Sequence, residues 1–182
     1  TKWRIGLSND SDLWQTRRKR KSTGMGCRGM YTITKGIEYD FENCKVINHY
    51  GDNYSGYTNH YREASRAILC KNGNIMLSHE TKIGQWMIPG GGREENETPA
   101  ECCIRGVAEE TGFIVKPEKC FLIMNEYYED WKFVSYYFAC VATGITERKP
   151  TEREIQVGAN PEWATINEAI DIFSHHQDYA VS

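Results

Sequence analysis

The spacing of apolar positions between residues 99 and 111 predicts a helix with one buried face. These positions recur at steps of three or four residues and so share one stripe of a helix; they are Ala100, Cys103, Ile104, Val107, Ala108 and Thr111. Thr98 and Glu101 form the capping-box pattern of a helix start, with Pro99 suited to the first helical position. Gly112 suits the left-handed residue that follows many helices, so we expect the helix to end there.

Short apolar runs predict strands on both sides of this helix. They cover residues 64–70, 75–78, 85–88, 121–128 and 133–142. An Asn-Gly pair in the segment 71–74 predicts a hairpin turn between the first two strands. Residues 37–41 alternate between apolar and acidic side chains, as in a half-buried strand. The polar segments 48–60 and 143–160 are expected to be loops.

The order of these elements favours an α+β fold. Thr165 and Glu168 form a second capping box, which predicts a C-terminal helix. Hairpins with two separate helices lack the regular strand–helix alternation of a doubly wound parallel sheet. We therefore expect a mixed β-sheet flanked by helices on both faces. Residues 60–182 are expected to form this domain, and residues 1–59 an N-terminal extension, either a small β element or a partly disordered segment.

The face of the predicted helix opposite its apolar stripe carries Glu101, Arg105, Glu109 and Glu110. Two adjacent carboxylates near a helix C-terminus oppose the helix dipole, so a positive charge should compensate them. A hard divalent cation with oxygen ligands is one candidate for that charge. The alternative, for the glutamate pair taken alone, is a solvated acidic face.

The segment Gly91–Phe113 resembles the box of the Nudix hydrolases, G-x5-E-x7-R-E-U-x-E-E-x-G-U, where U is a bulky apolar residue. The matching positions are Gly91, Glu97, Arg105, Val107, Glu109, Glu110, Gly112 and Phe113. The wider resemblance extends from about His60 to Tyr179. It implies an α/β/α sandwich and the hydrolysis of a pyrophosphate bond in a nucleoside diphosphate linked to another moiety, with Mg²⁺ or Mn²⁺ as cofactor.

The same resemblance assigns roles to individual residues. It implies that Glu109 and Glu110 hold the metal and that the backbone carbonyl near Gly91 adds a ligand. It implies that Glu97 and Arg105 join the loop to the helix and so support the catalytic site. A divalent metal at this place would neutralise phosphate oxygens and lower the pKa of bound water.

Substrate contacts are expected from three further side chains. Arg66 and Arg93 are candidate phosphate contacts, and the alternative for each is an ordinary surface arginine. Tyr128, with Tyr127, lies where relatives that cleave diadenosine polyphosphates carry a tyrosine, and could stack on a base. The alternative is an aromatic strand, in which tyrosines are common.

One signature position departs from the family pattern, because Gly106 stands where a glutamate is expected. Glycine inside a helix costs about 1 kcal/mol relative to alanine, and it removes a carboxylate one turn before Glu109 and Glu110. We therefore expect Gly106→Glu to raise both helix stability and metal affinity. The candidates for a replacement ligand are Glu154, ranked first because that loop faces the metal in many relatives, and Glu126, Glu129 and Glu152. The alternative function is a catalytically weakened or inactive Nudix-fold module that binds a nucleotide or a partner.

Composition narrows the remaining choices. The 182 residues carry a formal net charge of −3, so no overall field attracts nucleic acid or an anionic membrane. No apolar run reaches the length of a membrane span. The seven cysteines contain no C-x-x-C pair, which disfavours zinc and suits reduced thiols in the cytoplasm. We expect a small-molecule nucleotide substrate and leave a homodimer open.

Two motifs near the N-terminus do not change this interpretation. The basic run 17–21 is interpreted as a solvated segment rather than a nucleic-acid site. Gly24–Gly29 matches G-x-G-x-x-G, but a dinucleotide site needs a following helix, and residues 30–34 have the character of a strand.

Overall fold

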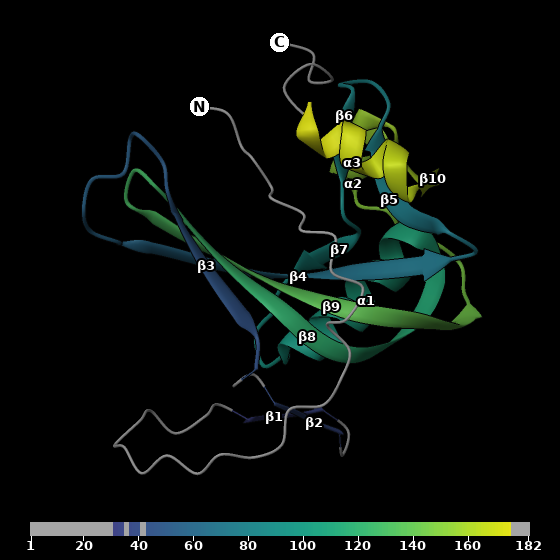
Figure 1. The fold of residues 1–182 in the computed structure, drawn as a ribbon, viewed down its shortest axis with the longest axis horizontal. Helices are drawn as coiled ribbons and strands as arrows, with labels where there is room; N and C mark the ends of the chain where they lie inside the picture. Colours follow the sequence, from purple (N-terminus) through teal and green to yellow (C-terminus); the bar gives the residue numbers. More distant parts are fainter. Residues whose placement is uncertain (1–30, 35–36, 41–42, 176–182) are drawn as a thin grey trace.

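The computed structural model describes residues 31–34, 37–40 and 43–175. The described residues form a mixed eight-stranded sheet, accompanied by three helices and a separate two-stranded sheet (Figure 1). The strands are β1 (Tyr31–Thr34), β2 (Ile37–Asp40), β3 (Lys45–Tyr50), β4 (His60–Lys71), β5 (Asn74–Glu80), β6 (Gln85–Met87), β7 (Gly90–Gly92), β8 (Phe113–Tyr128), β9 (Trp131–Ile145) and β10 (Ala159–Thr165). The helices are α1 (Pro99–Thr111), α2 (Glu152–Val157) and α3 (Ile166–Ser174).

The large sheet has the order β10-β5-β4-β9-β8-β3, with β6 paired to β5 and β7 paired to β4. β4 runs parallel to β9 and β3 runs parallel to β8, whereas the other pairs are antiparallel. The hairpin predicted from the Asn-Gly pair is confirmed, because Asn72 and Gly73 both have positive φ angles, 51° and 79°. The expected strands 64–70 and 75–78 lie within β4 and β5.

Helix α1 has the caps that its sequence predicts. The Thr98 side chain accepts from the Glu101 amide, and the Glu101 carboxylate accepts from the Thr98 amide at 3.0 Å. Gly112 is left-handed, with φ of 76°, and its amide donates to the Ala108 carbonyl. These local hydrogen bonds satisfy backbone groups that the helix leaves unpaired at its two ends.

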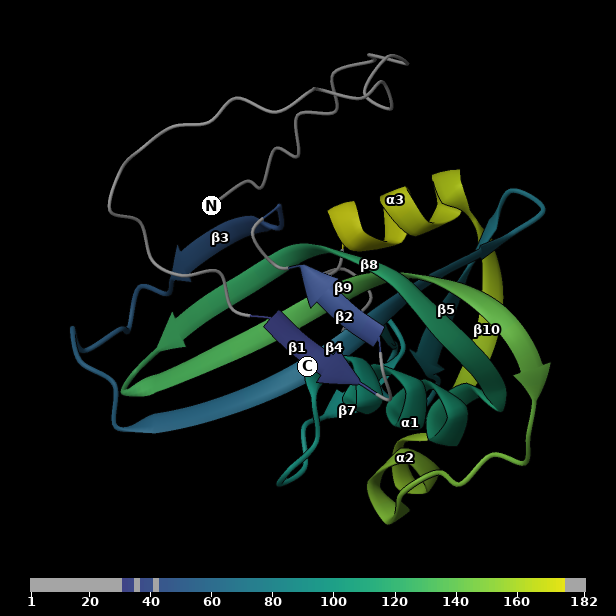
Figure 2. The same ribbon diagram turned by 90° about the horizontal axis from the view of Figure 1, so that it is seen from below.

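Side chains alternate between two hydrophobic clusters on opposite faces of the sheet, as the period of a strand requires. On β4, Ala67 and Leu69 join the cluster that includes α1, while Ile68 packs against the cluster that includes Ala169 and Ile172 of α3. Figure 2 shows α1 and α3 on opposite sides of the strands. The expected α+β fold, a mixed sheet flanked by helices, is confirmed.

Four elements differ from the sequence prediction. Residues 48–50, expected as loop, end the strand β3. The expected loop 143–160 contains the end of β9, all of α2 and the start of β10. The capping box of α2, Thr151 to Glu154, is a readable signal that the interpretation as polar loop missed.

The structure leaves some expectations untouched. The basic run 17–21 and the glycine motif 24–29 lie outside the described residues. Within the described part of the chain, no helix is long and apolar enough to cross a membrane. The six cysteines there are all free thiols.

Candidate active site

The site is built around the short strand β7 (Gly90–Gly92), which is called the glycine turn below. This strand pairs with β4 and lies under α1. A Cβ at Gly90 would stand 1.9 Å from the Ser65 carbonyl oxygen, so only glycine allows this approach of the two strands. Three α1 side chains then hold the turn. Their contacts are Gly90 N–H to Glu110 Oε2 (2.9 Å), Cys102 Sγ to Gly91 O (3.2 Å) and Arg105 Nη2 to Gly92 O (2.8 Å).

Gly106 packs directly against the same turn. A Cβ on Gly106 would lie 2.6 Å from Gly91 N, 2.7 Å from Gly90 C and 2.9 Å from Gly91 Cα. All three neighbours are backbone atoms, which cannot rotate away as a flexible side chain can. The expectation that Gly106→Glu would stabilise the helix is therefore wrong, because any larger residue pushes α1 away from the turn.

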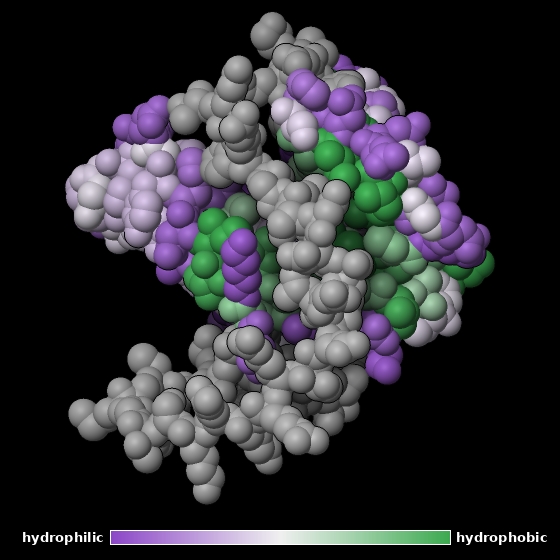
Figure 3. Space-filling view, in the orientation of Figure 1, coloured by the Kyte–Doolittle hydropathy of each residue, from purple (hydrophilic) through white to green (hydrophobic). Residues whose placement is uncertain are grey.

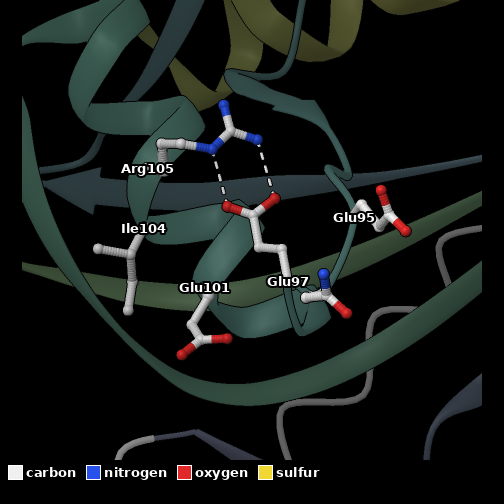
Figure 4. A pocket seen from close by; sticks show the side chains of 6 residues that line it. Glu95, Glu97, Glu101, Ile104 and Arg105 are labelled. Atoms are coloured by element: carbon white, nitrogen blue, oxygen red, sulfur yellow. Dashed lines mark hydrogen bonds and ion pairs between the residues drawn. The ribbon is translucent and has the colours of Figure 1, made fainter.

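Arg105 joins the loop before α1 to the helix. Its Nε and Nη2 donate to the two Glu97 carboxylate oxygens at 2.7 and 2.9 Å, and its Nη1 donates to Glu109 Oε2 at 2.9 Å. Figure 4 shows the guanidinium facing the Glu97 carboxylate. The hydrogen bond with Glu97 raises the pKa of Arg105. Burial acts to raise the pKa of Glu97, but the hydrogen bond from Arg105, the hydrogen bond from the Glu94 amide and the charge of Arg105 together outweigh burial, so the Glu97 pKa is lowered.

Glu109 and Glu110 have different surroundings. The Glu109 side chain is 40% exposed and paired with Arg105. Glu110 is 4% exposed, and its burial raises the pKa of the carboxyl. The Gly90 amide and the charge of Arg66 act against this shift in the Glu110 pKa, while the charge of Glu154 adds to it. Glu154 is thus a candidate replacement ligand whose charge acts on the Glu110 carboxyl.

The other candidate ligands are placed on three different elements. Glu126 lies on β8, Glu129 lies in the β8–β9 turn, and Glu152 lies at the start of α2. Glu154 itself also caps α2, accepting from the Thr151 amide at 2.6 Å. Glu80 of β5 is fully buried and was not among the predicted site residues. It pairs with Arg153 of α2 at 2.7 Å and so holds α2 against the sheet.

The donor set suits a hard cation in its chemistry, since it consists of carboxylate and carbonyl oxygens. Each donor nevertheless has a protein partner: Glu109 pairs with Arg105, Glu110 accepts from Gly90, and the Gly91 carbonyl accepts from Cys102. Among the described residues, no group of three His, Cys, Asp or Glu side chains is placed to hold a metal ion. The residues fit Mg²⁺ as a site of one or two carboxylates that substrate phosphates complete.

Positive charge at the C-terminus of α1 is supplied by the protein itself. Arg148 Nε donates to the Glu110 carbonyl at 2.7 Å, and its Nη2 donates to the Ala159 carbonyl at 2.9 Å. Arg105 neutralises Glu109 on the exposed side. The helix dipole is therefore compensated without a metal. Arg148 lies 38 residues after Glu110, so no local pattern could have identified it.

The two arginines expected to contact phosphate are placed differently. Arg66 is half-buried, and its Nη1 donates to the Ile88 carbonyl at 3.4 Å. Arg93 forms an ion pair with Glu63 and donates to the Glu97 carbonyl at 3.0 Å. The sequence analysis missed Arg62, which is exposed and whose Nη2 lies 3.2 Å from the position of a Cβ on Gly92.

Tyr128 and Tyr127 end the β8 strand in a group of aromatic rings. Tyr127 stacks on Tyr50 with centroids 4.6 Å apart, and Tyr128 meets His49 edge-on at 5.6 Å. Figures 1 and 2 place this end of the β8–β9 hairpin away from α1. The structure thus does not bring Tyr128 together with the glutamates of α1.

A pocket of about 400 Å³ lies beside the ion pair of Arg105 and Glu97 (Figure 4). Its other lining residues are Glu95, Asn96, Glu101 and Ile104. Carboxylates outnumber the one arginine, so this pocket repels phosphate. It lies on the loop side of α1, and neither Glu109 nor Glu110 lines it.

Comparison with known proteins identifies several curated proteins of similar sequence. Diphosphoinositol polyphosphate phosphohydrolase 2 of Mus musculus is 29% identical over 103 residues, which cover 57% of this chain and 55% of that protein. Diphosphoinositol polyphosphate phosphohydrolase 3-beta of Bos taurus is 31% identical over 104 residues, covering 57% and 61%. The chain thus spans little more than half the length of these curated relatives.

Solved structures show the same fold. The MutT protein from Bacillus halodurans aligns with a TM-score of 0.51 at 22% identity, over 60% of this chain and 72% of that one. A NUDIX hydrolase from Nitrosomonas europaea aligns with a TM-score of 0.50 at 19% identity, over 65% and 90%. The profile of the NUDIX domain matches residues 60–181. The chain therefore belongs to the NUDIX domain family.

Proposed function

We propose that the chain is a hydrolase that cleaves a phosphoanhydride bond in a small phosphorylated molecule, with Mg²⁺ or Mn²⁺ as cofactor. The observation that carries the proposal is the placement of Glu109 and Glu110 at the end of α1, where Glu110 accepts from the Gly90 amide of the glycine turn. Two substrate classes contain such a bond: nucleoside diphosphates linked to another moiety, and the diphosphoinositol polyphosphates named for the curated relatives.

In this proposal Glu109, Glu110 and the Gly91 carbonyl would hold the metal, with Glu154, whose charge acts on Glu110, as a further candidate carboxylate. The bound cation would neutralise phosphate oxygens and make its bound water more acidic. Arg105 and Glu97 support the site by holding the loop and the turn against α1. Bidentate pairs of this kind fix orientation as well as position.

Arg62 and Arg66 are the proposed phosphate contacts. They are four residues apart on β4, so their side chains leave the same face of the strand, and β4 pairs with the glycine turn between them, at Ala64 and Gly92. Arg93 would first have to leave Glu63. Tyr127 is already stacked on Tyr50, so base stacking there contributes little to the choice of substrate.

A second candidate function is a binding module that has lost its chemistry. The close packing of Gly106 on Gly90 and Gly91 favours it, because this contact removes one signature carboxylate and the space it would need. Such a module would still bind polyphosphates through Arg62 and Arg66.

The test is release of phosphate or nucleotide from a panel, with Mg²⁺, with Mn²⁺ and with chelator. The panel holds nucleoside triphosphates, nucleotide sugars, ADP-ribose, dinucleoside polyphosphates and diphosphoinositol polyphosphates. Metal-dependent release from any one of them supports the hydrolase and names its substrate class. Calorimetric binding without release, weakened by Arg62→Gln, would instead support the binding module.

A further inference from the structure

The strands at the two ends of the order β10-β5-β4-β9-β8-β3 differ in how they are protected from further strand pairing. β10 forms one edge, and its sequence contains Pro161 and Glu162, a proline and a charge that both discourage further strand pairing. β3 forms the other edge. Its sequence, Lys-Val-Ile-Asn-His-Tyr, has no proline and a single fixed charge, Lys45. Among the described residues β3 pairs with β8 alone, so its outer backbone groups face away from the sheet.

The exposed side chains at alternate positions of β3 form a pattern that is complementary to itself about Asn48. Val46 is 54% exposed and Tyr50 is 56% exposed, and Asn48 between them is exposed as well. Residues at steps of two share one face of a strand. Figure 3 shows a hydrophobic patch over β3, bordered by hydrophilic residues. The pattern is therefore apolar, amide, aromatic, centred on Asn48.

We propose that β3 is a dimerisation edge that pairs in antiparallel fashion with β3 of a second copy of this chain. A two-fold axis at Asn48 places Asn48 opposite itself and Val46 opposite Tyr50 of the partner copy. Aromatic and β-branched residues form favourable cross-strand pairs. Lys45 falls opposite Gly51, so the two lysines are separated by about six residues, roughly 20 Å, and do not repel each other strongly.

A second copy is the occupant that this edge fits, because the pattern is complementary to itself about one residue. Tyr50 is also held in place before pairing, since its ring stacks on Tyr127 at 4.6 Å with planes 12° apart. A side chain that is already ordered loses little conformational entropy on association. The resulting contact is small, so a reversible, concentration-dependent dimer is expected.

Sedimentation velocity of the full chain over a wide range of concentrations tests the interface. The wild-type sedimentation coefficient should rise with concentration, and Val46→Lys should weaken association about tenfold or more through two lost apolar pairs and two added charges. Ile145→Lys is the matched control, because Ile145 is 79% exposed on β9 and should leave the dimer intact. A wild-type protein that is monomeric throughout, or a dimer insensitive to Val46→Lys, would overturn the proposal.

The register has its own test, because Asn48 lies on the proposed axis. Asn48→Lys and Asn48→Asp should each weaken self-association by placing like charges opposite each other. An equal mixture of the two variants should restore dimers as a heterodimer, more strongly at low salt. Circular dichroism checks that each variant is folded, since Asn48 Oδ1 accepts from Asn125 at 2.9 Å. Failure of the mixture to associate better than either variant alone would rule out this register.

Discussion

Replacing Gly106 with alanine separates two effects that act in opposite directions. In an open helix position the substitution would stabilise the fold by about 1 kcal/mol, because alanine has the higher helix propensity. In this structure the added Cβ would stand 2.6 to 2.9 Å from three backbone atoms of Gly90 and Gly91. Real contacts of this kind need about 3.5 Å or more, so α1 would have to move by nearly 1 Å.

That movement lengthens the other contacts between α1 and the glycine turn. They include Gly90 N–H to Glu110 at 2.9 Å and Arg105 to the Gly92 carbonyl at 2.8 Å. Overpacking a close contact costs about 1–3 kcal/mol, and the strained hydrogen bonds add to it. After the gain in helix propensity, we expect Gly106→Ala to destabilise by about 1–2 kcal/mol, which is a fall in Tm of about 2–8 °C for a chain of this size.

Thermal and urea unfolding of matched variants measure this effect. Gly144→Ala on β9 is the control, because its Cβ would meet only the Ile114 side chain, at 3.4 Å or more. We expect this control to be neutral or slightly stabilising. A Tm for Gly106→Ala above that of wild type would refute the reasoning, and position 106 would then be an empty place for the missing glutamate.

Three further results are expected. Arg153→Met leaves the buried Glu80 carboxylate unpaired and should lower the free energy of unfolding in urea by about 2 kcal/mol. The loss should be smaller when Glu80→Gln is added, and an equal loss in the single and double variants would show that the two residues are not coupled. Because the Glu97 pKa is lowered from 4.5, its share of stability is present above that pH and is lost as pH falls through the folded value. Glu97→Gln should therefore flatten the acid side of the stability curve, and an unchanged curve would contradict the pairing. In Arg105→Lys the ammonium cannot donate to both Glu97 oxygens as the planar guanidinium does, so the free energy of unfolding should fall by about 2 kcal/mol. An unaltered free energy of unfolding would contradict this role of Arg105.

The features predicted from sequence are those that neighbouring residues determine. In each cap of α1 the bonded residues are three or four positions apart, and the β4–β5 turn depends on Asn72 and Gly73 alone. The strand β10 was missed because Pro161 and Asn160 interrupt its pattern, and its stability comes from pairing with β5 along its whole length.

The site was predictable only in part, because several of its contacts join residues that are far apart in the sequence. Arg105 and Glu97 are eight residues apart within one motif, and the structure brings them together. The role of Gly106 depends on its contact with Gly91, fifteen residues earlier, which the helix spacing does not reveal. Arg148 reaches the end of α1 from another loop, so a cation at the helix terminus was expected but its source was not.

The most direct test of the proposed hydrolase compares wild type with Glu110→Gln in metal-dependent release of phosphate or nucleotide from the same substrate panel. The amide keeps an acceptor for the Gly90 N–H, so the fold should persist while the charge is lost. Glu118→Gln, an exposed site on β8, is the matched control. The account predicts release that requires Mg²⁺ or Mn²⁺, is abolished by Glu110→Gln and is unchanged by Glu118→Gln. Undiminished release from Glu110→Gln, or none from wild type with any substrate, would contradict it.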